Sequence, residues 1–236
     1  VFIDAMNRLN HDEELQRNVV AFIEVPGRVE QPRADLKQRL AKNGVYDTAL
    51  EMPIITHELH NMDSDNVLNM ARHLGIKNAS DDKVKLIFIP CYLNGNDGIV
   101  DMPYYDVVLG NDLCVYPSYY EPWGYTPLEA VAFKVPCITT DLAGFGLWAN
   151  QQKGKCCEIT DGVKVIHRTD DNYSEVADGI KDTIKEYAAM DKKTADKCRT
   201  NAQKLSKKAL WSEFIQAYET AYDIAIKNRD ARVSVK

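Results

Sequence analysis

The sequence lacks any apolar run close to the roughly 20 residues that a membrane-spanning helix needs, and it does not open on a signal peptide. It also lacks an excess of basic residues: its formal net charge is -6, whereas surfaces that bind nucleic acids are basic. No internal repeat or low-complexity segment is present. These absences predict a protein with neither a membrane span nor a nucleic-acid partner.

The sequence also lacks the cysteine and histidine spacings that indicate metal or disulfide frameworks. Six cysteines are present, but no C-x-x-C pair occurs. Cys114 and Cys137 lie within apolar runs, where cysteine usually behaves as a small buried hydrophobic residue. His57 and His60 have no cysteine or carboxylate partners in a recognised ligand pattern. We therefore expect reduced cysteines, a cytoplasmic location and no metal ion.

Short apolar runs of strand length recur along the chain, with helical patterns between them. The runs span residues 19–25, 85–90, 113–118, 135–140 and 163–167. Several are apolar throughout rather than alternating, which is typical of parallel strands buried on both faces. The alternation of strands and helices predicts an α/β fold, with a Rossmann-like, doubly wound parallel sheet that carries helices on both faces.

The last quarter of the chain has a different composition and is nearly all helix-forming. Helix breaks are expected near residues 190–191 and 210–211, and residues 229–236 are expected to form a loose tail. We therefore divide the chain into a Rossmann-like domain over residues 1–173 and a C-terminal helical extension over residues 174–236 that packs on it.

One stretch, YPSYYEPWGYTPLEAVAFKVPCITTD (residues 116–141), concentrates aromatic residues, glutamates and a glycine directly after a predicted strand. Parallel sheets bind their ligands at the carboxyl ends of the strands. Thr126 and Glu129 have the spacing of a capping box, with Thr126 as the N-cap and Pro127 at the first helical position. Such a box does not account for Glu121, Trp123 or Gly124, which lie outside it.

A helix that begins here would also suit an anionic ligand. Free backbone N–H groups near Gly124, Tyr125 and Thr126 would form a cradle for phosphate. The carboxylates of Glu121 and Glu129 accept hydrogen bonds well from sugar hydroxyls. The stretch therefore predicts a site for a phosphate with a sugar on each side, which makes residues 1–173 a nucleotide-sugar-binding domain.

A second glycine segment, TTDLAGFGLW, follows the predicted strand at residues 135–140. If that strand is parallel to its predecessor, the segment lies at the same edge of the sheet. Gly144 and Gly146 then either form a wall of the binding cleft or serve only as turn glycines.

The run PSYYEPWGYTPLE contains the E-x7-E signature of retaining glycosyltransferases with two facing Rossmann-like domains, an arrangement called GT-B. Together with VPCITTDLAGFG, it closely resembles the glycogen synthases of the animal and fungal type. The likeness extends more thinly over essentially the whole chain. The region after VVAFIEVPGR is short where eukaryotic members carry a long helical insertion, so we expect a bacterial relative.

The resemblance implies both a fold and a reaction. This chain would be the donor-binding C-terminal half, without the N-terminal Rossmann-like half that binds the acceptor, and we expect it to be inactive alone. The reaction would be the retaining transfer of glucose from UDP-glucose to the 4-hydroxyl group of glycogen, an α-1,4-glucan. The reaction would need no metal or other cofactor. The full-length protein would be able to form a homo-oligomer.

The resemblance also implies a role for individual residues. Glu121 would be the catalytic residue beside the donor glucose, and Glu129 would hold the ribose. Tyr104 would stack on uracil, although Tyr105 is a rival for that place and both are candidates for buried core positions. The implied donor-binding residues are Glu129, Trp123, Gly124, Tyr125, Thr126 and Tyr104, of which Trp123 and Gly124 would meet the glucose, and Tyr125 and Thr126 the phosphates, through their backbone groups.

Two alternatives remain open on the residues alone. One is a sugar-nucleotide-binding module that senses its ligand without catalysis. The other is a different retaining GT-B glycosyltransferase, such as a sucrose- or trehalose-type enzyme, because the acceptor is chosen mostly by the other half of the molecule.

Overall fold

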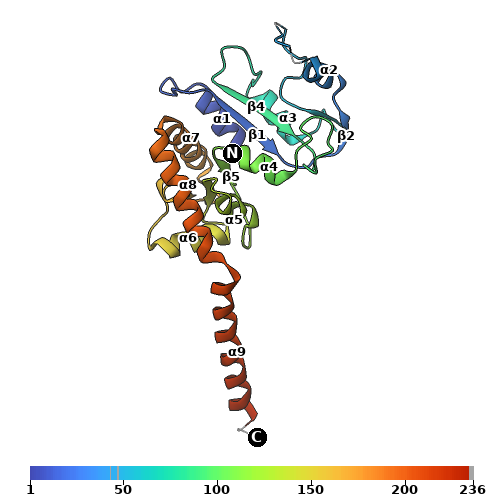
Figure 1. Cartoon of the computed structure of the whole chain (residues 1–236). Helices are drawn as coiled ribbons and strands as arrows, with labels where there is room; N and C mark the ends of the chain where they lie inside the picture. Colours follow the sequence, from blue (N-terminus) through green and yellow to red (C-terminus); the bar gives the residue numbers. More distant parts are fainter. Residues whose placement is uncertain (43, 47, 234–236) are drawn as a thin grey trace.

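Two parallel ladders form the centre of the molecule in the computed structural model, which describes residues 1–42, 44–46 and 48–233 (Figure 1). β1 (Val19–Glu24) pairs with β4 (Val84–Ile89), while β5 (Cys114–Val115), β6 (Cys137–Thr140) and β7 (Val163–Ile166) form the second ladder in that order. All five predicted strands are present, so the prediction of an α/β fold with parallel strands is confirmed. Within the described ranges, the two ladders are hydrogen-bonded separately rather than as one continuous sheet.

Three elements near residues 29–59 were not predicted from the sequence. β2 (Val29–Pro32) and β3 (His57–Leu59) form a short antiparallel pair, and α2 (Ala34–Lys42) follows β2. α2 has no buried residue, and β2 is largely exposed. The apolar periodicity that identifies elements in a sequence is therefore weak here.

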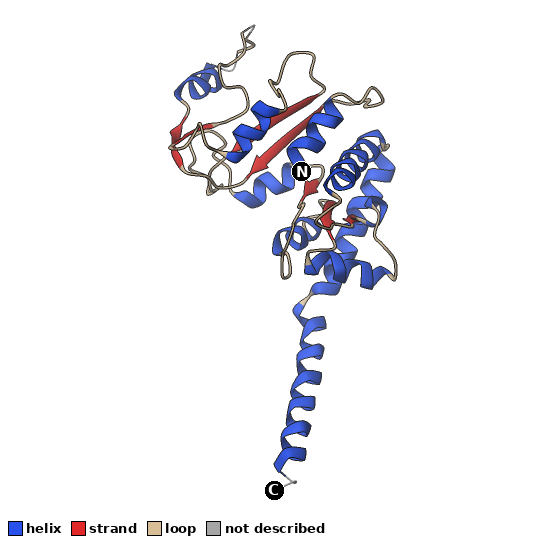
Figure 2. Ribbon diagram, turned by 180° about the vertical axis from the view of Figure 1, so that it is seen from behind, coloured by secondary structure: helices blue, strands red, loops and turns tan. Residues whose placement is uncertain are grey.

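Helices pack around the two ladders (Figure 2). Asp65 caps α3 (Asn66–His73) by accepting hydrogen bonds from the N–H groups of Val67 and Leu68. The predicted helix breaks near residues 190 and 210 are also confirmed. The helices are α1 (Phe2–Asn10), α3 (Asn66–His73), α4 (Tyr104–Gly110), α5 (Tyr125–Ala132), α6 (Gly144–Lys153), α7 (Tyr173–Ala189), α8 (Lys192–Ser206) and α9 (Trp211–Val233), with the short 3-10 helices η1 (Ile159–Asp161) and η2 (Lys207–Ala209).

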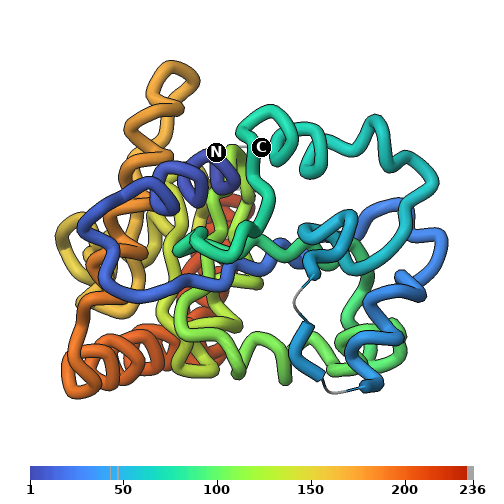
Figure 3. The backbone as a smooth tube through the Cα atoms, turned by 90° about the horizontal axis from the view of Figure 1, so that it is seen from above, coloured from blue at the N-terminus to red at the C-terminus, as the bar shows by residue number. Residues whose placement is uncertain are grey.

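The core has two main parts, and the late helices contribute to both. One part joins α1, β1 and β4 to α7, whose Val176, Ala177 and Ile180 are fully buried. Figure 3 shows α1, in dark blue, lying beside the orange late helices, and α1 contacts α7 as well as β4 and α3. The other part joins β5–β7 to α5, α6 and α8. Burial of this apolar surface, at about 25 cal/mol per Å², is what attaches α7 and α8 to the strands.

Burial of the strands differs from the sequence prediction at β1. β6 is buried on both faces, as expected of a parallel strand with helices on either side. β1 alternates instead, and Val20 and Phe22 are 53% and 41% exposed. β1 is therefore covered on one face only, although its sequence is apolar.

α9 projects away from the rest of the molecule (Figures 1 and 2). Phe214 in its first turn packs against Trp123 and Trp148, whereas Tyr222 and Ile226 are more than half exposed. The predicted loose tail is wrong for residues 229–233, which continue α9, and residues 234–236 lie outside the described part of the chain. None of the described helices has the length and hydropathy required to cross a bilayer.

The junction of η1, β7 and α8 leaves no room for a side chain at Gly162. Its φ of +92° is left-handed, and an added Cβ would collide with the backbone of Ala202 in α8. Gly154 shares the left-handed conformation, but an added Cβ there would have open space around it.

We predict that Gly162→Ala lowers the free energy of unfolding by about 2–5 kcal/mol, because a left-handed alanine costs about 1–2 kcal/mol and overpacking adds about 1–3 kcal/mol. Gly154→Ala, the matched control, carries only the first cost. Urea unfolding of both variants measures the difference. Equal losses in the two variants would contradict the packing of α8 on this turn.

Candidate functional site

The loop that follows β5 is tied to the start of α6 by backbone hydrogen bonds. The N–H of Glu121 donates to the carbonyl of Leu142 at 3.2 Å, and the N–H of Gly144 donates to the carbonyl of Glu121 at 3.0 Å. The N–H of Phe145 donates to the carbonyl of Trp123 at 2.6 Å. The loops after β5 and β6 therefore meet at one edge of the ladder, as their parallel pairing requires.

Two glycines at the start of α6 each allow a close backbone contact. A Cβ added at Gly144 would collide with the main-chain oxygen of Pro122, and one added at Gly146 would collide with the main-chain oxygen of Thr140. Both residues lie in the first turn of a helix that the sequence analysis missed. Gly144 is therefore required for packing between the two loops, and Gly146 for packing of α6 against the end of β6, so neither is simply a turn glycine.

α5 begins earlier than the capping-box interpretation predicts, and that interpretation is wrong. Gly124 is the N-cap, with a φ of +105°, and no side chain caps the helix. Thr126 and Pro127 lie inside the first turn, where the missing N–H of proline costs nothing because first-turn amides have no partner within the helix. Glu129 instead accepts a hydrogen bond from the hydroxyl of Tyr105 at 3.1 Å.

The first turn of α5 is accessible. Gly124 is buried, but Tyr125 is 73% exposed and Thr126 is also exposed. Because the helix has no side-chain cap, its first amides and the positive end of its dipole are available to an anion. The contrast with α6 is direct, since the first amides of α6 are already bonded to protein carbonyls.

Glu121 is held by its backbone and free in its side chain. Its N–H and its carbonyl are both bonded to the segment that enters α6, and Glu121 forms a parallel bridge with Ala143. The residue is exposed, and within the described residues its carboxylate makes no hydrogen bond or ion pair. The backbone of Glu121 is thus fixed, while its carboxylate is available to a ligand.

The side chain of Trp123 is occupied by packing. Its ring lies 6.2 Å from Phe145, 5.8 Å from Trp148 and 5.6 Å from Phe214, measured between ring centroids, with edge-on or tilted geometry. Such pairs contribute about 0.5–1.5 kcal/mol each beyond area burial. Any contact of Trp123 with a ligand on the loop side would therefore come from its backbone.

Tyr104 and Tyr105 are the first two residues of α4 and have different environments. Tyr104 is half-buried against the part of the core that joins β5–β7 to α5, α6 and α8. Burial raises the pKa of its phenol, and a hydrogen bond with Tyr116 partly offsets this increase. Tyr105 is 48% exposed, and its bond to the Glu129 carboxylate raises the pKa of its phenol. The ring centroids lie 5.4 Å apart, so both tyrosines belong to the surroundings of Glu129.

Three residues at this strand edge were not identified from the sequence. Asp141 follows β6, while His167 and Arg168 follow β7. Asp141 accepts from the ring of His167 at 2.5 Å and from the N–H of Arg168 at 2.9 Å. The guanidinium of Arg168 donates to the carbonyl of Pro117 and lies over the ring of Tyr119. Their position directly after strands was the available signal.

Comparison with known proteins shows the family of this chain. The family model of glycogen synthase matches residues 36–230. The chain belongs to the glycogen synthase family. It is 33% identical over 181 residues to glycogen [starch] synthase isoform 2 of Saccharomyces cerevisiae, a match that covers 74% of this chain and 25% of the yeast protein. Isoform 1 of the same yeast is 32% identical over 175 residues, with the same coverage.

Other similarities are narrower or weaker. The human liver glycogen synthase is 36% identical over 114 residues, which are 48% of this chain and 16% of the human protein. The solved structure of HepE from Anabaena, in complex with UDP, is similar with a TM-score of 0.45 and 16% identity, covering 93% of this chain and 52% of that one. This chain thus spans about a quarter of the length of its yeast relatives.

The bond between Tyr105 and Glu129 predicts a measurable titration. An anionic acceptor stabilises the protonated phenol, so we expect the pKa of Tyr105 to lie above that of a free tyrosine and to fall towards it in Glu129→Gln. NMR of tyrosine labelled with ¹³C at Cζ measures this pKa, and Tyr105→Phe assigns the signal. Glu121→Gln is the control and should leave the pKa unchanged. An unchanged pKa in Glu129→Gln would contradict the contact.

Proposed function

We propose that this protein is the donor-binding domain of a glycogen synthase, which transfers glucose from UDP-glucose to the 4-hydroxyl group of an α-1,4-glucan with retention. The observation that supports this most strongly is the loop from Glu121 to Gly124. This loop is locked to α6 and presents a free carboxylate next to the open start of α5. This loop and helix contain Glu121 and Glu129, the pair with the E-x7-E spacing to which the family resemblance assigns catalysis and donor binding.

The donor would lie across this helix start. The diphosphate would accept hydrogen bonds from the amides of Tyr125 and Thr126, and the absence of a side chain at Gly124 would let it come close. Glu129 would bind the ribose hydroxyls, with the hydroxyl of Tyr105 orienting its carboxylate. Tyr104 would stack on uracil, and the backbone of Trp123 and Gly124 would contact the glucose.

Glucose transfer would then depend on stabilising the charges that develop as the bond to the donor breaks. As the bond between glucose and diphosphate breaks, positive charge develops at the anomeric carbon and negative charge on the departing phosphate. Glu121 would stabilise the first charge, and the amino end of α5 the second. We propose that transfer needs no metal. The acceptor, an α-glucan, would be bound by other parts of the full-length protein, because this chain spans a quarter of the length of its relatives.

We further propose a cytoplasmic location. All six cysteines are free in the structure, and disulfides are rare in that compartment. From the family resemblance we also propose that the full-length protein forms a homo-oligomer and that its origin is bacterial.

The binding half of the proposal is tested by calorimetric titration with UDP. Glu129→Ala should weaken UDP binding about tenfold or more, because a hydrogen bond to a charged group contributes about 1.5–3 kcal/mol. Glu121→Ala should leave UDP binding unchanged, since UDP lacks the glucose, and Glu219→Ala on α9 is a distant control. Loss of thermal stability in Glu129→Ala without loss of UDP affinity would reduce Glu129 to a structural residue.

The catalytic half is tested in the full-length protein by transfer of labelled glucose from UDP-glucose to glycogen. Glu121→Gln removes the negative charge but keeps the shape, and we expect at least a 100-fold loss of kcat, as is typical for about 3 kcal/mol of lost charge stabilisation. Wild-type activity in this variant would exclude Glu121 as the catalytic residue.

A further inference from the structure

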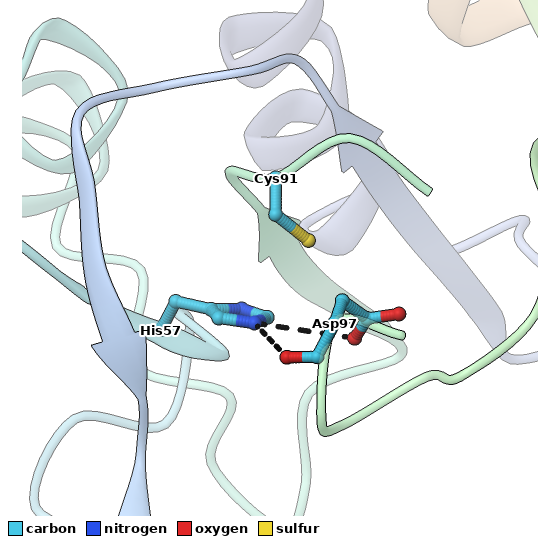
Figure 4. A group of neighbouring side chains, drawn as sticks. All are labelled: His57, Cys91 and Asp97. Carbon is cyan, nitrogen blue, oxygen red and sulfur yellow. Dashed lines mark hydrogen bonds and ion pairs between the residues drawn. The ribbon is translucent and has the colours of Figure 1, made fainter. Parts of the chain in front are cut away.

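Three side chains with metal-ligating atoms lie together at the carboxyl end of β4, and glucose transfer as described above gives them no role. His57 comes from β3, Cys91 lies just past the end of β4, and Asp97 lies in the loop that leads to α4 (Figure 4). Their ligand atoms all lie within 4.8 Å of one another. The side chains of His57 and Asp97 are each only 1% exposed, and Cys91 is partly exposed.

We propose that His57, Cys91 and Asp97 bind a divalent transition-metal ion of the zinc type, which orders the loop between β4 and α4. The donor set is one imidazole nitrogen, one sulfur and one carboxylate oxygen. Zinc binds all three kinds of atom, and three protein ligands with water in the fourth position form a common zinc arrangement. The sulfur disfavours magnesium and calcium, which prefer oxygen.

The spacing of the three groups suits a tetrahedral ion. Ligands held at about 2.0–2.3 Å from zinc stand roughly 3.3–3.8 Å from one another. Nε2 of His57 is 3.9 Å from Oδ1 of Asp97, close to that range. The widest separation in the group, 4.8 Å at most, requires movement of about 1 Å. Since Cys91 is partly exposed and lies in a loop, its side chain is the part able to make this movement.

The imidazole of His57 is already fixed from its other side. Nδ1 lies 2.8 Å from Oγ1 of Thr56, and histidine ligands usually hold their second ring nitrogen in such a hydrogen bond. Nε2 lies 3.0 Å from the main-chain oxygen of Asp97. A bound metal would replace that one hydrogen bond, and the orientation of the ring would be kept.

The carboxylate of Asp97 is fixed as well and retains a site for a metal. Oδ1 accepts from the N–H groups of Ile99 and Val100, and Oδ2 accepts from the N–H of Asp101. A carboxylate offers about four acceptor positions, two on each oxygen, so the three backbone bonds leave one, on Oδ2. Ligation through Oδ1 would replace the bond from Ile99 or Val100. Within the described residues, Asp97 pairs with His57, and no lysine or arginine forms an ion pair with it. A cation would offset the cost of burying this negative group.

The ion would act on the loop between residues 91 and 103. Cys91 and Asp97 lie in its first half, Asn94 bridges to Pro103, and the N–H of Tyr104 donates to the carbonyl of Leu93 at 2.9 Å. Joining Cys91 and Asp97 through a metal to His57 in β3 would therefore fix this loop against the body of the protein. No local motif reveals this group, because His57 and Asp97 are 40 residues apart.

Cobalt provides the direct test, since Co²⁺ replaces zinc in such sites and its bond to a thiolate absorbs in the near ultraviolet. We expect metal-stripped protein to bind one Co²⁺ per chain with this absorption, and zinc to displace it. Cys91→Ser should abolish the thiolate band, and His57→Gln and Asp97→Asn should weaken binding at least tenfold. Cys156→Ser, at an exposed cysteine, and His60→Gln, at a histidine that is 61% exposed, are matched controls that should bind as the wild type.

Two results would overturn the proposal. One is a wild-type protein without a thiolate–cobalt band, a measurement that needs no variant to fold. The other is a band that persists in Cys91→Ser and disappears in Cys156→Ser, which would assign the binding to a surface cysteine. Circular dichroism of each variant ensures that a lost band reflects a lost ligand rather than a lost fold.

Discussion

Two backbone hydrogen bonds, from Gly144 and Phe145 at the start of α6 to the carbonyls of Glu121 and Trp123, determine the shape of the candidate site. They fix the loop after β5 against the loop after β6, and they are possible only because Gly144 has no side chain to separate the two backbones. The ring of Trp123 packs on Phe145 and strengthens the same junction. The exposed carboxylate of Glu121 and the left-handed Gly124 both lie within or next to this fixed segment.

The first turns of α5 and α6 lie at the same edge and use their backbone amides differently. α6 uses its first amides to hold the loop, so those amides are unavailable to a ligand. α5 has a glycine N-cap and no side-chain cap, so its first amides remain available. A helix end without a partner is costly only where it is buried, and Tyr125 and Thr126 are exposed. The same local physics thus yields a structural contact at one helix and a binding surface at the other.

The sequence predicted the parts of the fold that are buried and periodic. The five parallel strands and the breaks between the late helices leave a local signal in apolar spacing or turn chemistry. β2, β3 and α2 leave little signal, because their side chains are largely exposed or their runs are only three or four residues long. For β1 the apolar sequence predicted burial on both faces, but Val20 and Phe22 are exposed.

The residues of the candidate site were found from motifs, but their contacts were not. The Thr-x-x-Glu spacing suggested a cap, whereas Gly124 caps the helix and Glu129 bonds to Tyr105, 24 residues away in sequence. Neither α6 nor the group of His57, Cys91 and Asp97 is visible locally, because each depends on segments that only the fold brings together.

The central claim is that the open start of α5 receives the diphosphate, and NMR of the ¹⁵N-labelled protein during titration with UDP tests it most directly. The account predicts that the amide signals of Tyr125 and Thr126 shift most and saturate together, while those of Gly144 and Phe145, already bonded to the loop, move little. Large shifts confined to α8 or α9, with Tyr125 and Thr126 unmoved, would contradict it.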